Sequence, residues 1–296
     1  MNILRTPEER FANLPDYPFA PHYAEVNGLR IHYVDEGPRD GEVILMLHGE
    51  PSWSYLYRHM IPVFVNACFR AVAPDLVGFG KSDKPTELAE YTYQRHVDWI
   101  RGWIEAVGLR DINLVCQDWG SLIGLRLAAE RPDWFARVVL ANGGLPTGDQ
   151  QMPEAFTQWQ AFSKNVSKLP ISKIITGGTT TNLTSDVKAA YDAPFPDESY
   201  KAGARILPSL VPTAPDDPAA SANRQAWKSL MRFGKPFLTA FSDGDPITRG
   251  GDRAFQRLVP GAKGQPHTTI EGAGHFLQED KGPELAQVII DFIVST

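Results

Sequence analysis

The chain has 296 residues, of which 43% are hydrophobic, 22% charged and 10% aromatic. This composition excludes an intrinsically disordered chain, and two cysteines are too few for a disulfide scaffold. A formal net charge of -6 argues against nucleic acid or an anionic membrane surface as a partner. No apolar run approaches the roughly 18 residues that a membrane-spanning helix needs, and the first ten residues contain no apolar signal-peptide region. We therefore expect a cytoplasmic protein.

Apolar runs and helical patterns alternate along most of the chain. Residues 23–34 are predicted to form a β-hairpin, because Asn27-Gly28 favours a type I′ turn and the second arm alternates apolar with polar residues. Continuous apolar runs predict strands covered on both faces at residues 43–47, 70–73, 112–116, 138–141 and 237–241, and a weaker run predicts another at residues 268–270. Helical patterns occupy residues 93–107, 121–130 and 283–293. This order predicts an α/β fold with a mostly parallel sheet and helices on both faces.

Residues 147–227 interrupt this alternation. The stretch is polar, rich in Pro, Gly and Thr, and contains no convincing strand. Because it is too long for a plain loop in a compact domain, we predict a helical cap inserted over the carboxyl edge of the sheet, where such folds bind ligands. The expected division is a core domain of residues 1–146 and 228–296 and a cap domain of residues 147–227.

The first chemical signal is a strand, tight turn and helix at Cys116-Gln117-Asp118-Trp119-Gly120. The pattern is that of a nucleophile elbow, G-x-S-x-G, with Asp118 at the elbow position and Cys116 in place of the first glycine. The following helix N-terminus favours an ionised carboxylate at this point. Asp118 could equally be an ordinary helix N-cap, so the elbow alone leaves both interpretations open.

A histidine and two acids follow the last two predicted strands. His275 comes after Gly272-Ala273-Gly274, the place of the triad histidine when the order is nucleophile, acid, histidine. Asp243 and Asp245 both follow residues 237–241. We expect Asp245 to be the acid because it precedes a Pro-Ile turn, while Asp243 could be a turn-forming residue. Asp118, Asp245 and His275 are therefore the predicted catalytic residues.

A fourth loop supplies hydrogen-bond donors for the reaction. His48-Gly49-Glu50-Pro51 directly follows residues 43–47. Its position predicts an oxyanion hole made by the backbone N–H groups of Glu50 and Trp119. Four loops at four strand ends thus agree on a hydrolase. No C-x-x-C or H-E-x-x-H pattern is present, so we predict neither a metal site nor a cofactor.

Five segments, spanning nearly the whole chain and the predicted cap, carry a resemblance to a known family: residues 48–58, 74–83, 116–120, 193–200 and 274–279. In these segments the sequence resembles the haloalkane dehalogenases of the α/β-hydrolase superfamily. Within that family it resembles the subfamily typified by the dichloroethane enzyme. The specific part is Gln117-Asp118-Trp119-Gly120 combined with His48-Gly49-Glu50-Pro51, whereas the segment around Ser82 is common to many relatives.

The resemblance implies hydrolysis of a small halogenated alkane to an alcohol and halide. Asp118 would form an alkyl ester, and His275, oriented by Asp245, would activate water to cleave it. The resemblance also implies that Trp119 and Trp159 bind the halide, although Trp159 could simply pack in the cap. Candidate pocket residues are Phe156, Phe162 and Trp53, and Trp227 is expected to pack near the sheet. We expect a monomer.

Three other functions remain open at this point. An epoxide hydrolase would use the same aspartate together with cap tyrosines, for which Tyr191 and Tyr200 are candidates, but Glu50 stands where those enzymes usually have an aromatic residue. A haloacid dehalogenase would need an arginine in place of Trp119. A ligand receptor without catalysis would not need Asp118, Asp245 and His275 together.

Overall fold

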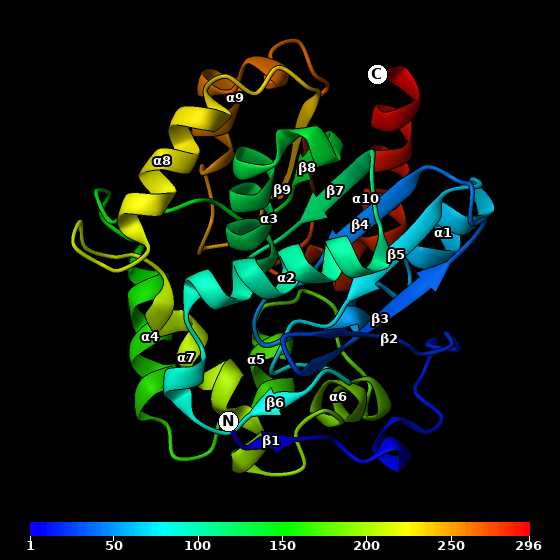
Figure 1. Ribbon diagram of the computed structural model, residues 1–296, viewed down its shortest axis with the longest axis vertical. Coiled ribbons are helices and arrows are strands. Elements are labelled where there is room, and N and C mark those ends of the chain that lie inside the picture. The colour runs from blue at the N-terminus through cyan, green and yellow to red at the C-terminus, as the bar shows by residue number, and fades with distance from the viewer.

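A central sheet of eight strands runs through the protein, whose computed structural model describes residues 1–296 (Figure 1). Its strands are β2 (His22–Val26), β3 (Leu29–Glu36), β4 (Val43–Leu47), β5 (Arg70–Pro74), β7 (Ile112–Cys116), β8 (Phe135–Leu140), β9 (Phe237–Ser242) and β10 (Thr268–Ile270). The order is β10-β9-β8-β7-β4-β5-β3-β2. β3 alone runs opposite to the other seven strands, so the predicted hairpin, the predicted strands and the mostly parallel α/β sheet are confirmed.

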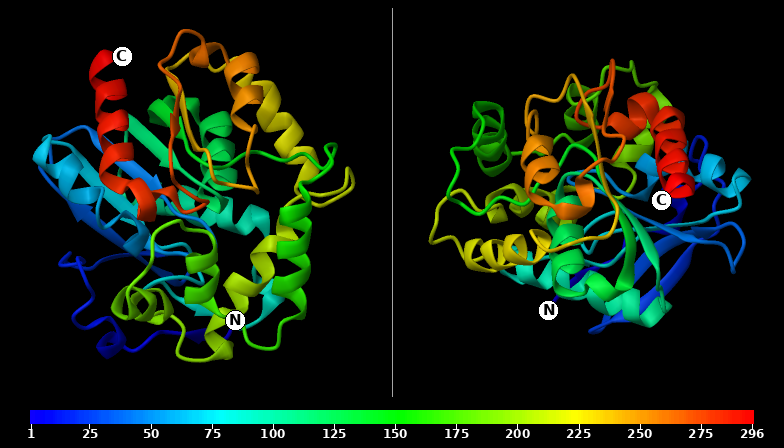
Figure 2. Two further views of the ribbon diagram at one scale, coloured as in Figure 1. Left: turned by 180° about the vertical axis from the view of Figure 1, so that it is seen from behind. Right: turned by 90° about the horizontal axis from the view of Figure 1, so that it is seen from above.

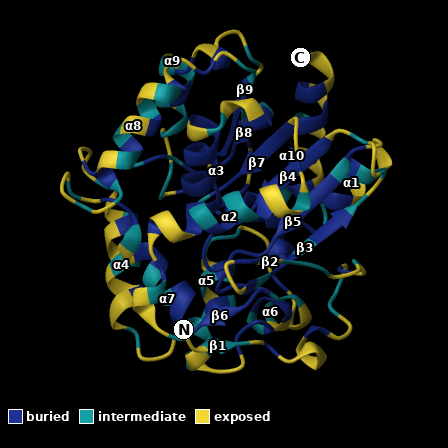
Figure 3. Ribbon diagram, in the orientation of Figure 1, coloured by how far each residue is buried: buried dark blue, intermediate teal, exposed yellow.

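The centre of the sheet is buried on both faces, as its continuous apolar runs predicted (Figure 3). Every residue of β4 and β7 is buried. These two strands are parallel neighbours, and their last residues, Leu47 and Cys116, are paired in register. The loop of Glu50 and the turn of Asp118 therefore leave the sheet at the same edge, side by side. A separate two-stranded sheet, β1 (Ile3–Leu4) with β6 (Lys84–Pro85), had no counterpart in the predicted strands.

Helices cover both faces of the sheet (Figure 2). One face carries α2 (Tyr93–Val107), α3 (Trp119–Glu130), α8 (Ala220–Leu230) and α9 (Asp252–Leu258), and the other carries α1 (Ile61–Asn66) and α10 (Leu277–Ser295). The predicted helix at 93–107 is confirmed: Thr92 caps its start and Gly108, in the left-handed conformation, ends it. Helix α10 begins six residues before the predicted start at Pro283, because a first turn precedes a kink at Lys281.

Four helices between β8 and β9 lie beyond the carboxyl ends of the strands: α4 (Glu154–Asn165), α5 (Ile171–Gly177), α6 (Ser185–Asp192) and α7 (Ala202–Leu210). We propose that they form the cap within residues 147–227, and we refer to them as the cap helices. The proposed boundary at residue 227 falls inside α8, which packs along the core helix α3. No helix of the protein has the length and apolar character needed to cross a membrane.

Candidate active site

Asp118 occupies a strained turn between β7 and α3. Its backbone has φ 48° and ψ -126°, a conformation outside the helix and strand regions. The turn is also tight, since a Cβ at Gly120 would lie 1.9 Å from the carbonyl oxygen of Leu47. The side chain of Asp118 makes no capping hydrogen bond to α3, so it is not the ordinary N-cap that the sequence left open. The Asp118 carboxylate is therefore free of hydrogen bonds to α3 and lies at the carboxyl edge of the sheet.

The loops of Glu50 and His275 lie next to Asp118, as the sequence predicted. The backbone N–H of Glu50 donates to Asp118 Oδ1 over 2.7 Å, and His275 Nε2 lies 3.6 Å from Asp118 Oδ2. Trp119 is the first residue of α3, so its backbone N–H has no acceptor within the helix and stays available beside the same carboxylate. The two carboxylate oxygens of Asp118 thus have different surroundings, one at the predicted oxyanion hole and one facing the imidazole.

Asp245, and not Asp243, contacts the ring of His275. Asp245 Oδ2 lies 3.0 Å from His275 Nδ1, and Asp245 Oδ1 accepts the backbone N–H of Ile247 over 2.8 Å. The hydroxyl of Thr248 also donates to Asp245. Burial opposes ionisation, but His275 and these donors lower the pKa of Asp245 to about 2. Asp243 is exposed and accepts the N–H of Gly272 over 2.9 Å, which is a turn contact.

The charges around His275 set the protonation state of the site. Burial alone lowers the pKa of His275, but the carboxylates of Asp245 and Asp118 outweigh it and raise that pKa to about 10. Burial and the neighbouring Asp118 raise the pKa of Glu50 well above its ordinary value. The neighbouring carboxylates thus favour the cationic form of His275, and loss of the charge on Asp118 would make His275 a stronger candidate for a base.

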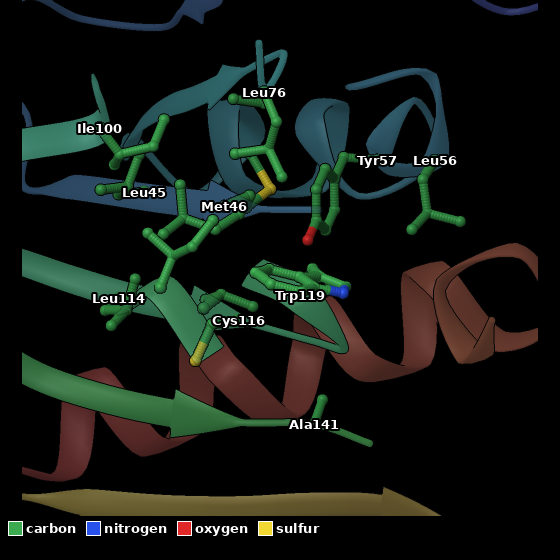
Figure 4. Packing of buried hydrophobic residues seen from close by; sticks show 14 of the residues in the cluster. Leu45, Met46, Leu56, Tyr57, Leu76, Ile100, Leu114, Cys116, Trp119 and Ala141 are labelled. Atoms are coloured by element: carbon green, nitrogen blue, oxygen red, sulfur yellow. The ribbon is translucent and has the colours of Figure 1, made fainter. Parts of the chain in front are cut away.

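A cavity of about 590 Å³ lies over this edge of the sheet. It is lined by Glu50, Asp118, Trp119 and His275 from the core and by Phe156, Trp159 and Phe162 from α4. Trp119 packs beside Cys116 and Tyr57 at the end of β7 (Figure 4). The sequence correctly placed Phe156 and Phe162 at the pocket. No group of three or more His, Cys, Asp or Glu side chains is arranged to hold a metal ion.

The tryptophans differ in what their indole N–H groups do. Trp227 donates to the carbonyl of Leu145 over 2.8 Å and stacks on Phe255, so it packs against the core as predicted. Trp53 is fully buried away from the cavity and donates to the carbonyl of Ala190 over 3.2 Å, so its prediction as a pocket residue was wrong. The structure records no such partner for Trp119 or Trp159. Both therefore border the cavity with an uncommitted donor.

The cap tyrosines that an epoxide hydrolase would need do not reach the cavity. Tyr191 is completely buried, and its hydroxyl donates to Glu279 Oε2 over 2.5 Å. Tyr200 is not among the residues that line the cavity. An opening alkoxide at Asp118 would therefore find no tyrosine to protonate it.

Two buried amides complete the site, and the sequence analysis missed both. Gln117 Nε2 lies 3.0 Å from His275 Nε2 and 3.3 Å from the carbonyl of His275. The side-chain amide of Asn142 donates to the same backbone carbonyl of His275 over 3.1 Å. The backbone carbonyl of Asn142 accepts the N–H of Asp118 over 3.0 Å. The available signal was a polar residue directly after a buried strand, as at Asn142 after the predicted strand 138–141.

Comparisons with known proteins agree with this geometry. Residues 42–282 match the family model described as the alpha/beta hydrolase fold. A haloalkane dehalogenase of Psychrobacter cryohalolentis is 56% identical over 99% of this chain and 98% of the relative, and one of Mycolicibacterium paratuberculosis is 54% identical over 99% and 98%. The chain belongs to the haloalkane dehalogenases.

The family membership fixes the type of reaction. The protein is a hydrolase that acts on carbon–halide bonds, and the epoxide hydrolase alternative is not favoured. Among solved structures, the tetrameric haloalkane dehalogenase DpaA from Paraglaciecola agarilytica NO2 superposes with a TM-score of 0.91 at 37% identity, covering 100% of this chain and 99% of that one. The predicted fold and family are thereby confirmed.

Proposed function

We propose that this dehalogenase converts haloalkanes to a primary alcohol and halide through an ester on Asp118. In the first step Asp118 Oδ2 attacks the carbon that bears the halogen. The new carbon–oxygen bond forms as the carbon–halogen bond breaks, and the bonding pair leaves with the halide. Asp118 Oδ1 is held by the N–H of Glu50 at 2.7 Å, which leaves Oδ2 as the attacking oxygen.

Stabilisation of the departing halide is the role we propose for Trp119 and Trp159. A halide accepts no proton at neutral pH, so hydrogen-bond donors must converge on it in a site with little water. Trp119 belongs to α3 and Trp159 to the cap helix α4, and both line the cavity. Their uncommitted indole N–H groups would hold the anion from the sheet side and from the cap side.

In the second step we propose that His275 acts as the general base. It removes a proton from a water molecule, whose oxygen attacks the ester carbon of Asp118. The negative charge that develops on Asp118 Oδ1 is held by the N–H groups of Glu50 and Trp119. The ester bond then breaks, the leaving alkoxide takes the proton from His275 to become the alcohol, and Asp118 releases the remaining proton of the water to solvent and is regenerated as the carboxylate. Asp245 keeps the ring in the tautomer whose Nε2 can accept the proton.

The observation that carries this proposal is the position of the Asp118 carboxylate, 2.7 Å from Glu50 N and 3.6 Å from His275 Nε2, in a cavity that holds two indoles. A halide-release assay with short 1-chloro- and 1-bromoalkanes, beside a styrene-oxide-type epoxide, tests it. We expect halide release that disappears in Asp118→Ala, and no epoxide opening. Epoxide turnover without halide release would contradict the proposal.

The oligomeric state needs its own measurement. The sequence led us to expect a monomer, whereas the similar enzyme DpaA is described as tetrameric. The two assemblies differ fourfold in mass, so light scattering of the purified protein distinguishes them.

A further inference from the structure

The loop that presents His275 is bonded to the cap by more than one hydrogen bond. We call residues 272–280 the base loop and residues 178–181, between α5 and α6, the cap segment. The N–H of Phe276 donates to the carbonyl of Gly178 over 3.0 Å, and the hydroxyl of Thr180 donates to the carbonyl of Gly272 over 2.7 Å. Gly178, His275 and Phe276 also line the cavity. The cap segment and the catalytic histidine are therefore held together at the wall of the active site.

Asp280 is the centre of this contact. Its Oδ1 accepts the N–H groups of Thr180 over 3.0 Å and Thr181 over 2.8 Å, both from the cap segment. Its Oδ2 accepts the N–H of Gly274, the residue before His275, over 2.8 Å. The carboxylate of Asp280 thus binds the backbone of the cap segment and the backbone of the base loop.

Ordinary helix capping does not account for these bonds. Asp280 lies in the first turn of α10, where an acidic side chain commonly caps its own helix. Here no side-chain capping bond is made, and every donor to Asp280 comes from residues 180, 181 and 274. The side chain is turned toward the cap segment and the base loop instead.

The base loop needs such an anchor. It begins with Gly272-Ala273-Gly274, and the glycines at both ends of this tripeptide have wide conformational freedom. At Gly274 the approach of the cap segment is close, since a Cβ there would lie 2.5 Å from the carbonyl oxygen of Gly178. A catalytic base must be held within about 0.5 Å of its productive position. Hydrogen bonds that backbone N–H groups donate to a charged acceptor are among the stronger means of doing so.

We propose that Asp280 is a positioning residue that fixes His275 for the hydrolysis step by tying the base loop to the docked cap. This inference rests on the proposed function, because it assigns His275 to the second step alone. The attack of Asp118 on the substrate does not use His275 as a base. Loss of Asp280 should therefore slow ester hydrolysis while the formation of the ester continues.

The test is rapid-quench kinetics of halide release from a 1-bromoalkane by Asp280→Asn. The substitution keeps the shape of the side chain but replaces one acceptor oxygen by an NH2 group, which faces N–H donors. We expect a burst of halide at the wild-type rate, followed by steady turnover that is slower by about tenfold. This factor corresponds to the loss of one hydrogen bond to a charged group. Both kcat and KM should fall together, because the ester accumulates.

Two further variants serve as controls. Asp291→Asn makes the same chemical change on the exposed face of α10 and should match the wild type. Thr180→Val removes only the exposed hydroxyl that binds Gly272, and it should slow hydrolysis in the same direction by a smaller factor. If Asp280→Asn does not fold, Thr180→Val still tests the contact from the cap side.

The outcomes distinguish a failure of the positioning role of Asp280 from a failure of the proposed two-step mechanism. Equal losses in the burst and in steady turnover, or wild-type kinetics in a folded Asp280→Asn, would overturn the positioning role. If His275→Gln forms no ester adduct either, the failure lies in the proposed two-step function and not in Asp280.

Discussion

Asp245 and His275 come from the ends of two neighbouring strands, β9 and β10, and meet with Asp245 Oδ2 3.0 Å from His275 Nδ1. Asp243, two residues earlier, faces outward and accepts only the N–H of Gly272 at the start of the base loop. The turn after β9 thus buries Asp245 and leaves Asp243 exposed.

From this arrangement we predict a large difference between two alanine variants. Asp245→Ala removes the group that fixes the tautomer of His275, and it should lower kcat by up to about 10⁴-fold, the loss found on neutralising the aspartate of a serine-protease triad. Asp243→Ala removes one exposed turn contact and should cost a few-fold at most. Steady-state halide release compares them, and equal losses would reassign the acid.

A second prediction concerns the halide site. Trp159→Phe keeps an aromatic ring in the cavity but removes the indole N–H, and the loss of one oriented donor costs about 3 kcal/mol, or roughly 10²-fold in rate. Trp119→Phe should behave in the same way. Added bromide should quench the fluorescence of the wild type through contact with these rings. Unchanged turnover and quenching in Trp159→Phe would mean that the second donor lies elsewhere in the cap.

The sequence predicted those features that depend on local pattern. Buried runs such as 112–116 could be recognised as strands because both faces of a central strand are apolar. Asp118, Asp245 and His275 could be proposed together because each lies in the turn or loop that follows such a run. The short helix α1 was not predicted, since six residues with Pro62 give too few turns for a clear period.

Features that depend on contacts between distant segments could not be predicted in this way. Gln117 reaches His275 across 158 positions, and the composition around it does not reveal that contact. Trp53 was a candidate pocket residue, but the sequence does not determine the direction in which its side chain points. In the structure it packs on Tyr55 and donates to the cap at Ala190.

A third prediction follows from the charges on the imidazole. Burial alone lowers the pKa of His275, but Asp245 and Asp118 raise it to about 10 in the free protein. Ester formation removes the charge of Asp118, so the pKa of His275 falls in the alkyl-enzyme. Because only the neutral ring accepts a proton from water, ester hydrolysis should speed up as pH rises through that lower pKa and then level off.

Single-turnover decay of the ester, followed from about pH 6 to about pH 10, measures this dependence. Asp245→Asn provides the comparison, since it removes the other charge that raises the pKa of His275. A hydrolysis rate that falls as pH rises would contradict the assignment of His275 as the base.

A fourth prediction concerns the buried ion pair between Arg58 and Glu279, which lies near the end of the base loop. The Arg58 guanidinium binds both oxygens of Glu279 at 2.6 Å, and Tyr191 of α6 donates to the same carboxylate. Arg58→Ala would leave the Glu279 carboxylate buried without its cation, at a cost of about 3–5 kcal/mol in the free energy of unfolding. Urea unfolding measures it. The double variant Arg58→Met/Glu279→Gln should recover part of the loss, and equal stability of Arg58→Ala and wild type would refute the prediction.

The most direct test of the central claim is mass spectrometry of His275→Gln after mixing with a 1-bromoalkane. Without its base the protein should still form the ester but fail to hydrolyse it, so one alkyl group should accumulate on the peptide that contains Asp118, together with one halide released per chain. The wild type, turning over under the same conditions, should show little adduct. An unmodified Asp118 peptide in His275→Gln, with the wild type active, would contradict the two-step account.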